Sequence, residues 1–226
     1  SENREWPVIL DPVVQANTNT SNIRDQMVTE KRVIDYTYHI IECGYYQTKG
    51  IERIFVKYKQ LPVLRSSDVV VAAYMQLKKM QTSSNTVPVE VHKVNGTWES
   101  ESITWSNKPE YDTTIEDYAL VRNEGVYTWD ITDIAREWYE TGENTGMMFK
   151  ASDAVEQAAD NRYQQFYSSD YSTWGDTEPT LTLLFRNNNG LESYWDYTSA
   201  SAGRAGTGHI NNYTGNLVWV HSDMGF

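Results

Sequence analysis

The sequence predicts an all-β sandwich that contains one short helix and continues into a hairpin-like extension. Three observations carry this expectation. Short apolar segments of strand-like composition recur between residues 53 and 186. One segment, residues 130–142, repeats its apolar side chains at helical spacing instead. From residue 187 the composition changes to glycine, asparagine, serine and aromatic residues.

The strand segments differ in pattern. Residues 53–60 and 87–94 alternate apolar and polar side chains over part of their length, as strands with one buried face do. Residues 68–79 form a longer and more continuous apolar run, which predicts a strand covered on both faces. Three further segments have suitable lengths for strands, namely residues 146–151, 162–169 and 179–186.

A turn signal follows the strand at residues 87–94. Asn95 and Gly96 both tolerate positive φ, so they predict a type I′ hairpin with Trp98 at the start of the returning strand. Pro109 would end that strand, because proline has no N–H to donate to a ladder.

The spacing of two tryptophans in this segment leaves their direction open. Trp98 and Trp105 are seven residues apart. A straight strand would place them on opposite faces, whereas a bend within residues 99–102 would turn both inward. We expect Trp98, Trp105 and Pro109 to serve the scaffold rather than a ligand.

The predicted helix has a face and two ends. Its apolar residues fall at positions i, i+3, i+4 and i+7, and they are Ile131, Ile134, Ala135 and Trp138. Asp130 or Thr132 is suited to cap the first amides, and Gly142 is suited to end the helix in the left-handed conformation. We expect this helix to plug one end of the sandwich with Trp138 buried as a structural residue.

The chain divides near residue 187. Residues 1–186 are long enough to bury a core as one β-sandwich domain. Residues 187–226 are too few to bury a core of their own, although residues 213–223 have strand character after a Thr-Gly-Asn turn. We therefore expect a linker followed by a hairpin-like extension.

Charge and composition argue against several partners. Asp and Glu outnumber Lys and Arg by 31 to 19, and the resulting net charge of −12 disfavours nucleic acid. No apolar run reaches the roughly 20 residues that cross a bilayer, so we expect no membrane insertion. The 8 Trp, 16 Tyr and single Cys of this acidic chain fit a secreted or cell-wall-associated bacterial protein.

The pattern of reactive residues does not predict an enzyme or a cofactor. Cys43 is the only cysteine, and the four histidines are not at metal-ligand spacing. The sequence has no G-x-S-x-G elbow, and the glycine-rich residues 203–208 lack the lysine and the helix of a phosphate-binding loop. Glu99 and Glu101 would share the solvated face of a strand.

Metal binding is left open. Several aspartates lie in or beside expected loops, and calcium is held by such oxygen ligands. No EF-hand spacing is present, so the ligands of a structural calcium ion are not assigned. The aspartates are Asp11, Asp25, Asp112, Asp153, Asp160, Asp170 and Asp176.

Aromatic residues indicate a candidate ligand surface. Binding modules for polysaccharides place flat Trp or Tyr rings against the C–H faces of sugars. Tyr171 and Trp174 follow the strand at residues 162–169 and stand in a polar loop. A single aromatic residue is more often part of a core, but these two are the candidate ligand-binding residues.

Four stretches, taken in order, resemble a known family. They begin "RIFVKYKQLPV", "VEVHKVNGTWES", "YTWDITDIAREWY" and "DNRYQQFYSSDY". Together they are similar to the DNRLRE domain, a non-catalytic β-sandwich of bacterial and archaeal surface proteins that is itself similar to carbohydrate-binding modules. The likeness spans residues 7–186. Residues that match the family pattern, with a structural role implied, are Trp98, Thr104, Trp105, Pro109, Asp130, Trp138 and Arg162.

The flanking segments resemble parts of a larger type of protein. Residues 6–14 and 190–226 look like the segments around this module in YD-repeat (Rhs-type) wall-associated proteins. In those proteins a shell of YD repeats encloses a C-terminal toxin, often a nuclease. The resemblance implies that this chain holds the module and the start of the repeat region, without the repeats or the toxin.

Two functions from different classes fit these features. The first is an extracellular jelly-roll module that binds cell-wall or other polysaccharide for its parent polypeptide. The second is a structural spacer that leads into the YD-repeat shell and has no ligand; a polysaccharide-acting enzyme is a weaker third. Solvent-facing Trp and Tyr residues would favour the module, and burial of every Trp from Trp98 to Trp174 would favour the spacer.

Overall fold

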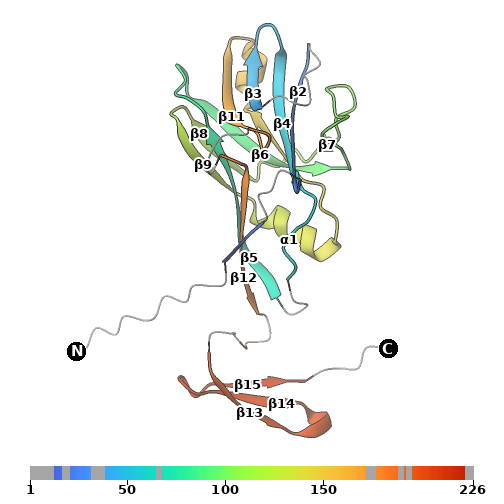
Figure 1. The fold of residues 1–226 in the computed structure, drawn as a ribbon, viewed down its shortest axis with the longest axis vertical. Helices are drawn as coiled ribbons and strands as arrows, with labels where there is room; N and C mark the ends of the chain where they lie inside the picture. Colours follow the sequence, from blue (N-terminus) through green and yellow to red (C-terminus); the bar gives the residue numbers. More distant parts are fainter. Residues whose placement is uncertain are drawn as a thin grey trace, which may run out of the picture.

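The computed structural model describes residues 13–16, 21–31, 39–64, 68–171, 177–187, 191 and 195–221. Within them the chain is mostly β-strand, in one larger and one smaller antiparallel sheet (Figure 1). The larger sheet contains β1 (Val13–Gln15), β2 (Ile23–Thr29), β3 (Ile40–Tyr46), β4 (Gly50–Tyr58), β5 (Asp68–Lys79), β6 (Val87–Asn95), β7 (Glu110–Tyr111), β8 (Asp117–Val121), β9 (Gly125–Asp130), β10 (Met147–Ala151), β11 (Arg162–Tyr167) and β12 (Thr180–Asn187). The smaller contains β13 (Tyr197–Ser201), β14 (Thr207–Asn211) and β15 (Leu217–Val220).

The strands of the larger sheet enclose the core. Its main path runs β1-β12-β5-β11-β3-β4-β10-β6-β7, while β2 adds to β4, β8 to β6 and β9 to β5. The ring of Trp129 in β9 lies 5.0 Å from that of Phe149 in β10 and 6.1 Å from that of Phe166 in β11. The Trp129 indole N–H donates to the Val89 carbonyl in β6 at 2.9 Å. Strands distant along the path therefore pack face to face, and the predicted all-β sandwich is confirmed.

β5 departs from the pattern that its sequence predicts. Val70, Ala73, Met75 and Leu77 are buried, whereas the side chains between them are partly exposed. The expectation of two covered faces is wrong, because only one face of β5 turns to the core and the other lies at the surface of the sandwich.

The predicted helix forms as α1 (Thr132–Thr141). The Asp130 carboxylate accepts the Thr132 N–H at 2.9 Å. Gly142 ends the helix with φ 73°, and its N–H donates to the Trp138 carbonyl. Trp138 is 3 % exposed and joins the main core, so its expected burial is confirmed.

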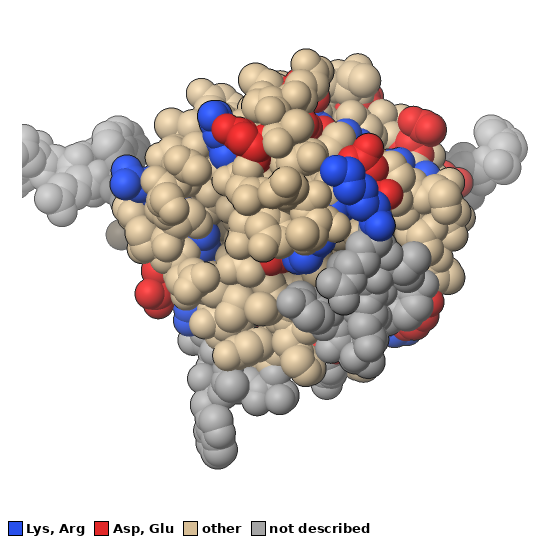
Figure 2. Space-filling view, turned by 90° about the horizontal axis from the view of Figure 1, so that it is seen from above, with Lys and Arg blue, Asp and Glu red and all other residues tan. Residues whose placement is uncertain are grey.

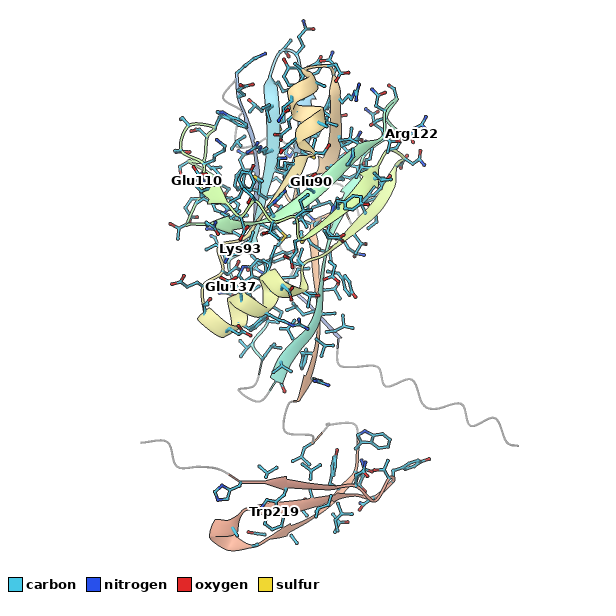
Figure 3. All side chains as sticks on the ribbon, turned by 180° about the vertical axis from the view of Figure 1, so that it is seen from behind. Glu90, Lys93, Glu110, Arg122, Glu137 and Trp219 are labelled. Atoms are coloured by element: carbon cyan, nitrogen blue, oxygen red, sulfur yellow. The ribbon has the colours of Figure 1, made fainter. Side chains whose placement is uncertain are left out.

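Several polar contacts hold α1 against the sandwich, and two of them flank its buried stripe. Lys93 of β6 and Glu137 of α1 point toward each other, with 2.5 Å between Nζ and Oε1 (Figure 3). The Tyr139 hydroxyl donates to the Pro62 carbonyl at 2.7 Å. These contacts fix the helix on either side of its buried stripe.

A second helix corrects the expectation of only one. Helix α2 (Asp153–Ala158) has no apolar stripe, and ion pairs hold it in place. Glu156 accepts two bonds from the Arg53 guanidinium, at 3.1 and 2.8 Å. Lys150 Nζ lies 2.6 Å from Asp153 Oδ1. Because such pairs leave no periodic signal, sequence analysis misses this helix.

The predicted type I′ hairpin at Asn95 and Gly96 is wrong both in its turn, because Asn95 does not have positive φ, and in its returning strand. β6 ends at Asn95 and Gly96 has φ 149°, but no strand forms in residues 97–109. The strand that returns along β6 is β7, which begins at residue 110. Trp98 instead packs on Phe55, with 5.6 Å between ring centroids, because the outer surface of the sheet is apolar at this point.

The loop at residues 96–109 covers this outer surface with a second, smaller core. Trp98 is buried there, and its indole N–H donates to the Thr145 carbonyl at 3.0 Å. Trp105 is partly buried against the same cluster, and the Lys108 ammonium lies 4.1 Å from its ring centroid. Both tryptophans thus contact the protein itself, and the turns of this loop keep Glu99 and Glu101 off any strand. The buried members are Val28, Phe55, Val94, Trp98, Ile103 and Met148.

The C-terminal segment forms three strands where a hairpin was predicted. β14 pairs with β13 on one side and with β15 on the other. β13 carries mostly small polar side chains, which explains why apolar patterning does not reveal it. Leu217 and Trp219 of β15 are 63 % and 51 % exposed. Trp219 is labelled on the small sheet in Figure 3. A sheet of this size leaves apolar side chains uncovered, as the length of the segment implies.

Candidate functional site

The outward side of β11 carries a row of three side chains, Tyr163, Gln165 and Tyr167, which we call the β11 row. They alternate along the strand with Gln164 and Phe166, which are fully buried. Each member of the row is partly exposed. An amide thus stands between two aromatic rings on one open strand face.

A polar groove lies beside one end of this row. Residues 81–85 line one side, and residues 161–163 and 165 line the other. Its volume is about 190 Å³. The lining consists of amides, hydroxyls, Arg162 and Tyr163, and we call it the amide groove. Such groups donate and accept hydrogen bonds in several directions, which suits a ligand rich in hydroxyl groups.

Close contact between β3 and β11 sets the position of the row. Gly44 of β3 pairs with Tyr163, and its φ of 130° is one that other residues rarely adopt. A Cβ atom at this position would lie 2.2 Å from the Arg162 carbonyl oxygen. Glycine therefore lets the strands approach, and the Tyr163 ring packs on that of Tyr46 at 4.9 Å.

A chain of hydrogen bonds fixes the wall of the amide groove. The buried Gln164 amide donates to the Asn85 carbonyl at 3.1 Å and accepts the Ser83 hydroxyl at 2.9 Å. Ser83 in turn accepts a bond of 2.8 Å from the ammonium of Lys79, whose pKa burial lowers to about 8. Residues 83–85 are therefore held from below by the core.

Buried charges hold the middle of the row. Gln165 donates to Glu42 at 2.6 Å and accepts a bond of 3.1 Å from Gln81, so both ends of its amide are fixed. The Lys49 ammonium contacts Glu42 and lies 3.2 Å from Glu52. Burial, together with the Glu42 carboxylate, raises the pKa of Glu52 to about 8.

The predicted ligand residue Tyr171 lies at the far end of the row. Its ring packs on Tyr167 at 4.5 Å and meets the edge of His39 at 6.5 Å. The turn before it is anchored by Asp25 of β2, which accepts the N–H of Ser169 at 3.1 Å and also its hydroxyl. Burial raises the pKa of Asp25. Trp174, the other predicted ligand residue, lies outside the described residues.

Four of the residues predicted to be structural lie away from the row, whereas Arg162 stands next to it. Trp98 and Trp105 belong to the second core, Trp138 belongs to the main core, and Pro109 stands directly before β7. Arg162 lines the amide groove and pairs with Asp160 at 2.7 Å. The groove itself has no simple sequence signal, because its two sides are separated by about 80 residues of chain.

Five of the seven aspartates considered as calcium ligands are described, and they are dispersed; Asp11 and Asp176 lie outside the described residues. In the described part of the chain no three His, Cys, Asp or Glu side chains gather as a metal site would require. Asp25 binds Ser169, Asp153 pairs with Lys150, and Asp112 accepts the Thr114 N–H at 2.9 Å.

Fold and surface together describe an antiparallel β-sandwich with an open row of tyrosines and amides, the general construction of a sugar-binding module. The chain belongs to carbohydrate-binding module family 96, which it matches over residues 39–184. The matched region contains the β11 row, the amide groove and Tyr171, while the C-terminal sheet lies outside it. No curated protein matches the chain.

Proposed function

We propose that the chain binds a polysaccharide through the β11 row and the amide groove. The observation that carries this proposal is the alternation of Tyr163, Gln165 and Tyr167 on one open strand beside a groove of amides and hydroxyls. Tyrosine rings offer flat apolar surface to sugar C–H groups, and amides bond to sugar hydroxyls. Membership of a carbohydrate-binding module family supports the same ligand class.

We also propose that the module is not catalytic. Glycoside hydrolysis needs two carboxyl groups that both reach the scissile bond. The carboxyl groups beneath the row, Glu42 and Glu52, are 2 % and 0 % exposed and are paired with Lys49. Their role in this proposal is to hold Gln165 and the strands around it.

The setting that we propose is extracellular, within a larger YD-repeat protein. Its support is the acidic, tyrosine-rich composition and the resemblance of the flanking segments. Residues 1–186 would be the module, and residues 187–226 would lead into the repeats, with the small sheet as the start of that region. In the described residues, no helix has the length and apolar character to cross a membrane.

A structural spacer without a ligand is the second candidate, and one observation favours it. Trp98, Trp129 and Trp138 are 6 %, 0 % and 3 % exposed, so these large rings are buried in the cores and do not face a ligand. The tyrosines of the β11 row are what distinguish a binding module from such a spacer.

Affinity electrophoresis of single variants on gels containing soluble polysaccharides tests the proposal. We expect retardation of the parent on at least one polysaccharide, and loss of most of it in Tyr163→Ala. Tyr118→Ala is the matched control, because Tyr118 on β8 is 60 % exposed and stands on a different strand. Free migration of the parent on every wall and plant polysaccharide would favour the spacer.

A further inference from the structure

Three charged side chains lie buried beneath the middle of the β11 row, and we call them the buried triad. They are Glu42 of β3, Glu52 of β4 and Lys49 in the turn between these strands. Glu42 pairs in register with Gln165 and accepts a hydrogen bond from its amide at 2.6 Å. The Lys49 ammonium contacts Glu42 and lies 3.2 Å from Glu52. The triad therefore supports the residue at the centre of the row.

Charged groups on the surface at this end of the domain stand in a different environment. Figure 2 looks down on the end of the sandwich that holds the β3–β4 turn, where charges of both signs are scattered over a mostly uncharged surface. Water and salt screen such charges, so they need not balance locally. The Lys49 side chain is only 11 % exposed, and both carboxyl groups of the triad are almost completely buried. The triad therefore has to balance its charges internally.

The charges of the triad do not balance while both carboxyl groups are ionised, because two carboxylates then face one ammonium. Lys49 donates to Glu42, whereas both Glu52 oxygens are buried and accept no hydrogen bond from the described residues. A buried carboxylate without donors is costly, so the protonated form is favoured. In agreement, burial and the charge of Glu42 raise the pKa of Glu52 to about 8.

The groups around the triad do not supply the missing positive charge. The Arg53 guanidinium is bound by Glu156 at 3.1 and 2.8 Å, and the Lys79 ammonium donates to a hydroxyl of the groove wall. Burial and the Glu52 carboxylate raise the pKa of the Cys43 thiol, so this group stays neutral. Other titratable groups beside the triad are two of opposite charge and two tyrosines, namely Glu30, Lys31, Tyr46 and Tyr163.

A second negative charge in the triad would act on the row at two points. Glu42 Oε1 accepts the Gln165 amide, and Glu42 Oε2 accepts the Lys49 ammonium. With Glu52 ionised, the two carboxylates repel each other and compete for this ammonium, so the acceptor that orients Gln165 is no longer held. Burial and the Glu42 charge also raise the pKa of Tyr163, which places the end of the row in the same electrostatic field.

We infer that Glu52 is a positioning residue of the ligand site, which holds one proton, donates it in a hydrogen bond to Glu42 and so keeps Gln165 oriented for a glycan. This inference rests on the proposed function and adds to it the regulation of the same site by pH. As the pH rises, Glu52 releases the proton to solvent hydroxide and both carboxyl groups become ionised. The site is thus ordered at neutral pH and disordered at its centre in alkaline solution.

Infrared difference spectroscopy of the full chain tests the proton without a glycan. We expect the spectrum of the parent minus that of Glu52→Gln to contain a protonated-carboxyl band at pH 6.5 that is gone at pH 9.5. Glu42→Gln should abolish the same band, because one carboxylate then balances Lys49. Glu99→Gln is the control and should keep the band, because the Glu99 side chain is 61 % exposed. A missing band at pH 6.5, or a band that persists in Glu42→Gln, would overturn the inference.

Affinity electrophoresis at the same two pH values tests the effect on binding. Gels contain xyloglucan, xylan, polygalacturonate or alginate, and retardation is measured against a polymer-free gel of the same pH. Uronic carboxyl groups ionise well below pH 6.5, so the charge of the polymers is constant. On the polymer that retards the parent, we expect its apparent affinity to fall at least about tenfold between these values, as the protonated fraction does. Glu52→Gln, which cannot lose a proton, should bind equally at both.

The outcomes separate the inference from the proposed function. A parallel fall in the parent and in Glu52→Gln would overturn the inference and assign the titration to another group, such as Lys79, whose pKa is also about 8. Retardation of the parent that is independent of pH would overturn the inference and leave the proposed function intact. Absence of retardation on every polymer would overturn the proposed function and its regulation together, while the infrared band still decides where the proton lies.

Discussion

Trp138→Ala tests how much α1 contributes to the sandwich. The Trp138 side chain is 3 % exposed, and it packs in the main core with Ile134 and Ala135. Its indole N–H has no hydrogen-bond partner among the described residues, so the loss is one of packing. Truncation of a buried Trp costs about 3–5 kcal/mol. For a chain of this size each kcal/mol lowers Tm by about 2–4 °C, so we expect a decrease of about 6–20 °C.

Calorimetry and near-ultraviolet circular dichroism of parent and variant measure this change. Glu137→Ala is the matched control, because Glu137 is the adjacent helical residue and its pair with Lys93 is partly exposed. Such a pair contributes about 0–1 kcal/mol, so the control should unfold within a few degrees of the parent. If Trp138→Ala unfolds at the same temperature as Glu137→Ala, the helix does not close the core and the reasoning fails.

Three further predictions concern the support of the site. The pKa of Glu52 is raised from 4.5 to about 8, so its contribution to stability is complete below pH 4.5 and is lost as the pH rises through 8. Glu52→Gln should therefore flatten the fall in unfolding free energy between these values in urea titrations, and an unchanged slope would contradict the assignment. Asp25→Ala leaves the Ser169 donors without an acceptor, so it should lower the unfolding free energy by about 1–3 kcal/mol and weaken the binding of long glycans. Unaltered stability would show that this anchor is dispensable. Gly44→Ala meets backbone at 2.2 Å and should destabilise far more than Gly125→Ala, which shares positive φ but has open space around it; equal thermal shifts would rule out the contact as the cause.

The sequence predicts the elements whose signals are local. The apolar stripe that ends in Trp138, followed by Gly142, identifies α1 because helix periodicity and capping involve neighbouring residues. The predicted hairpin at Asn95 does not form, because contacts with residues far along the chain determine the path of this segment. Asn95 stays in β6 without the positive φ of a type I′ turn, and Trp98 packs on Phe55, an apolar surface that only the folded sheet brings near.

The candidate site is predictable only in part, for the same reason. Tyr171 is found from its aromatic ring in a polar loop, and the structure places it at one end of the β11 row. Gln81 and Gln165 are ordinary polar residues in the sequence, and they become a site when β11 lies beside the end of β5. A groove of amides has no spacing rule, so single-sequence reasoning overlooks it.

The first and last strands of the sandwich pair with each other, and this pairing determines at which end the chain enters and leaves the domain. Val13 of β1 pairs with Leu184 of β12, and Asn187 pairs with Asp68 at the start of β5, so chain enters and leaves at one end. The other end of β5 is Lys79, eleven residues along the strand and about 36 Å away, where the amide groove begins. A pull on both chain ends would peel β1 from β12 one hydrogen bond at a time, while the groove at the opposite end carries no load. The strand pairing that closes the sandwich thus lies far from the amide groove, the candidate ligand site.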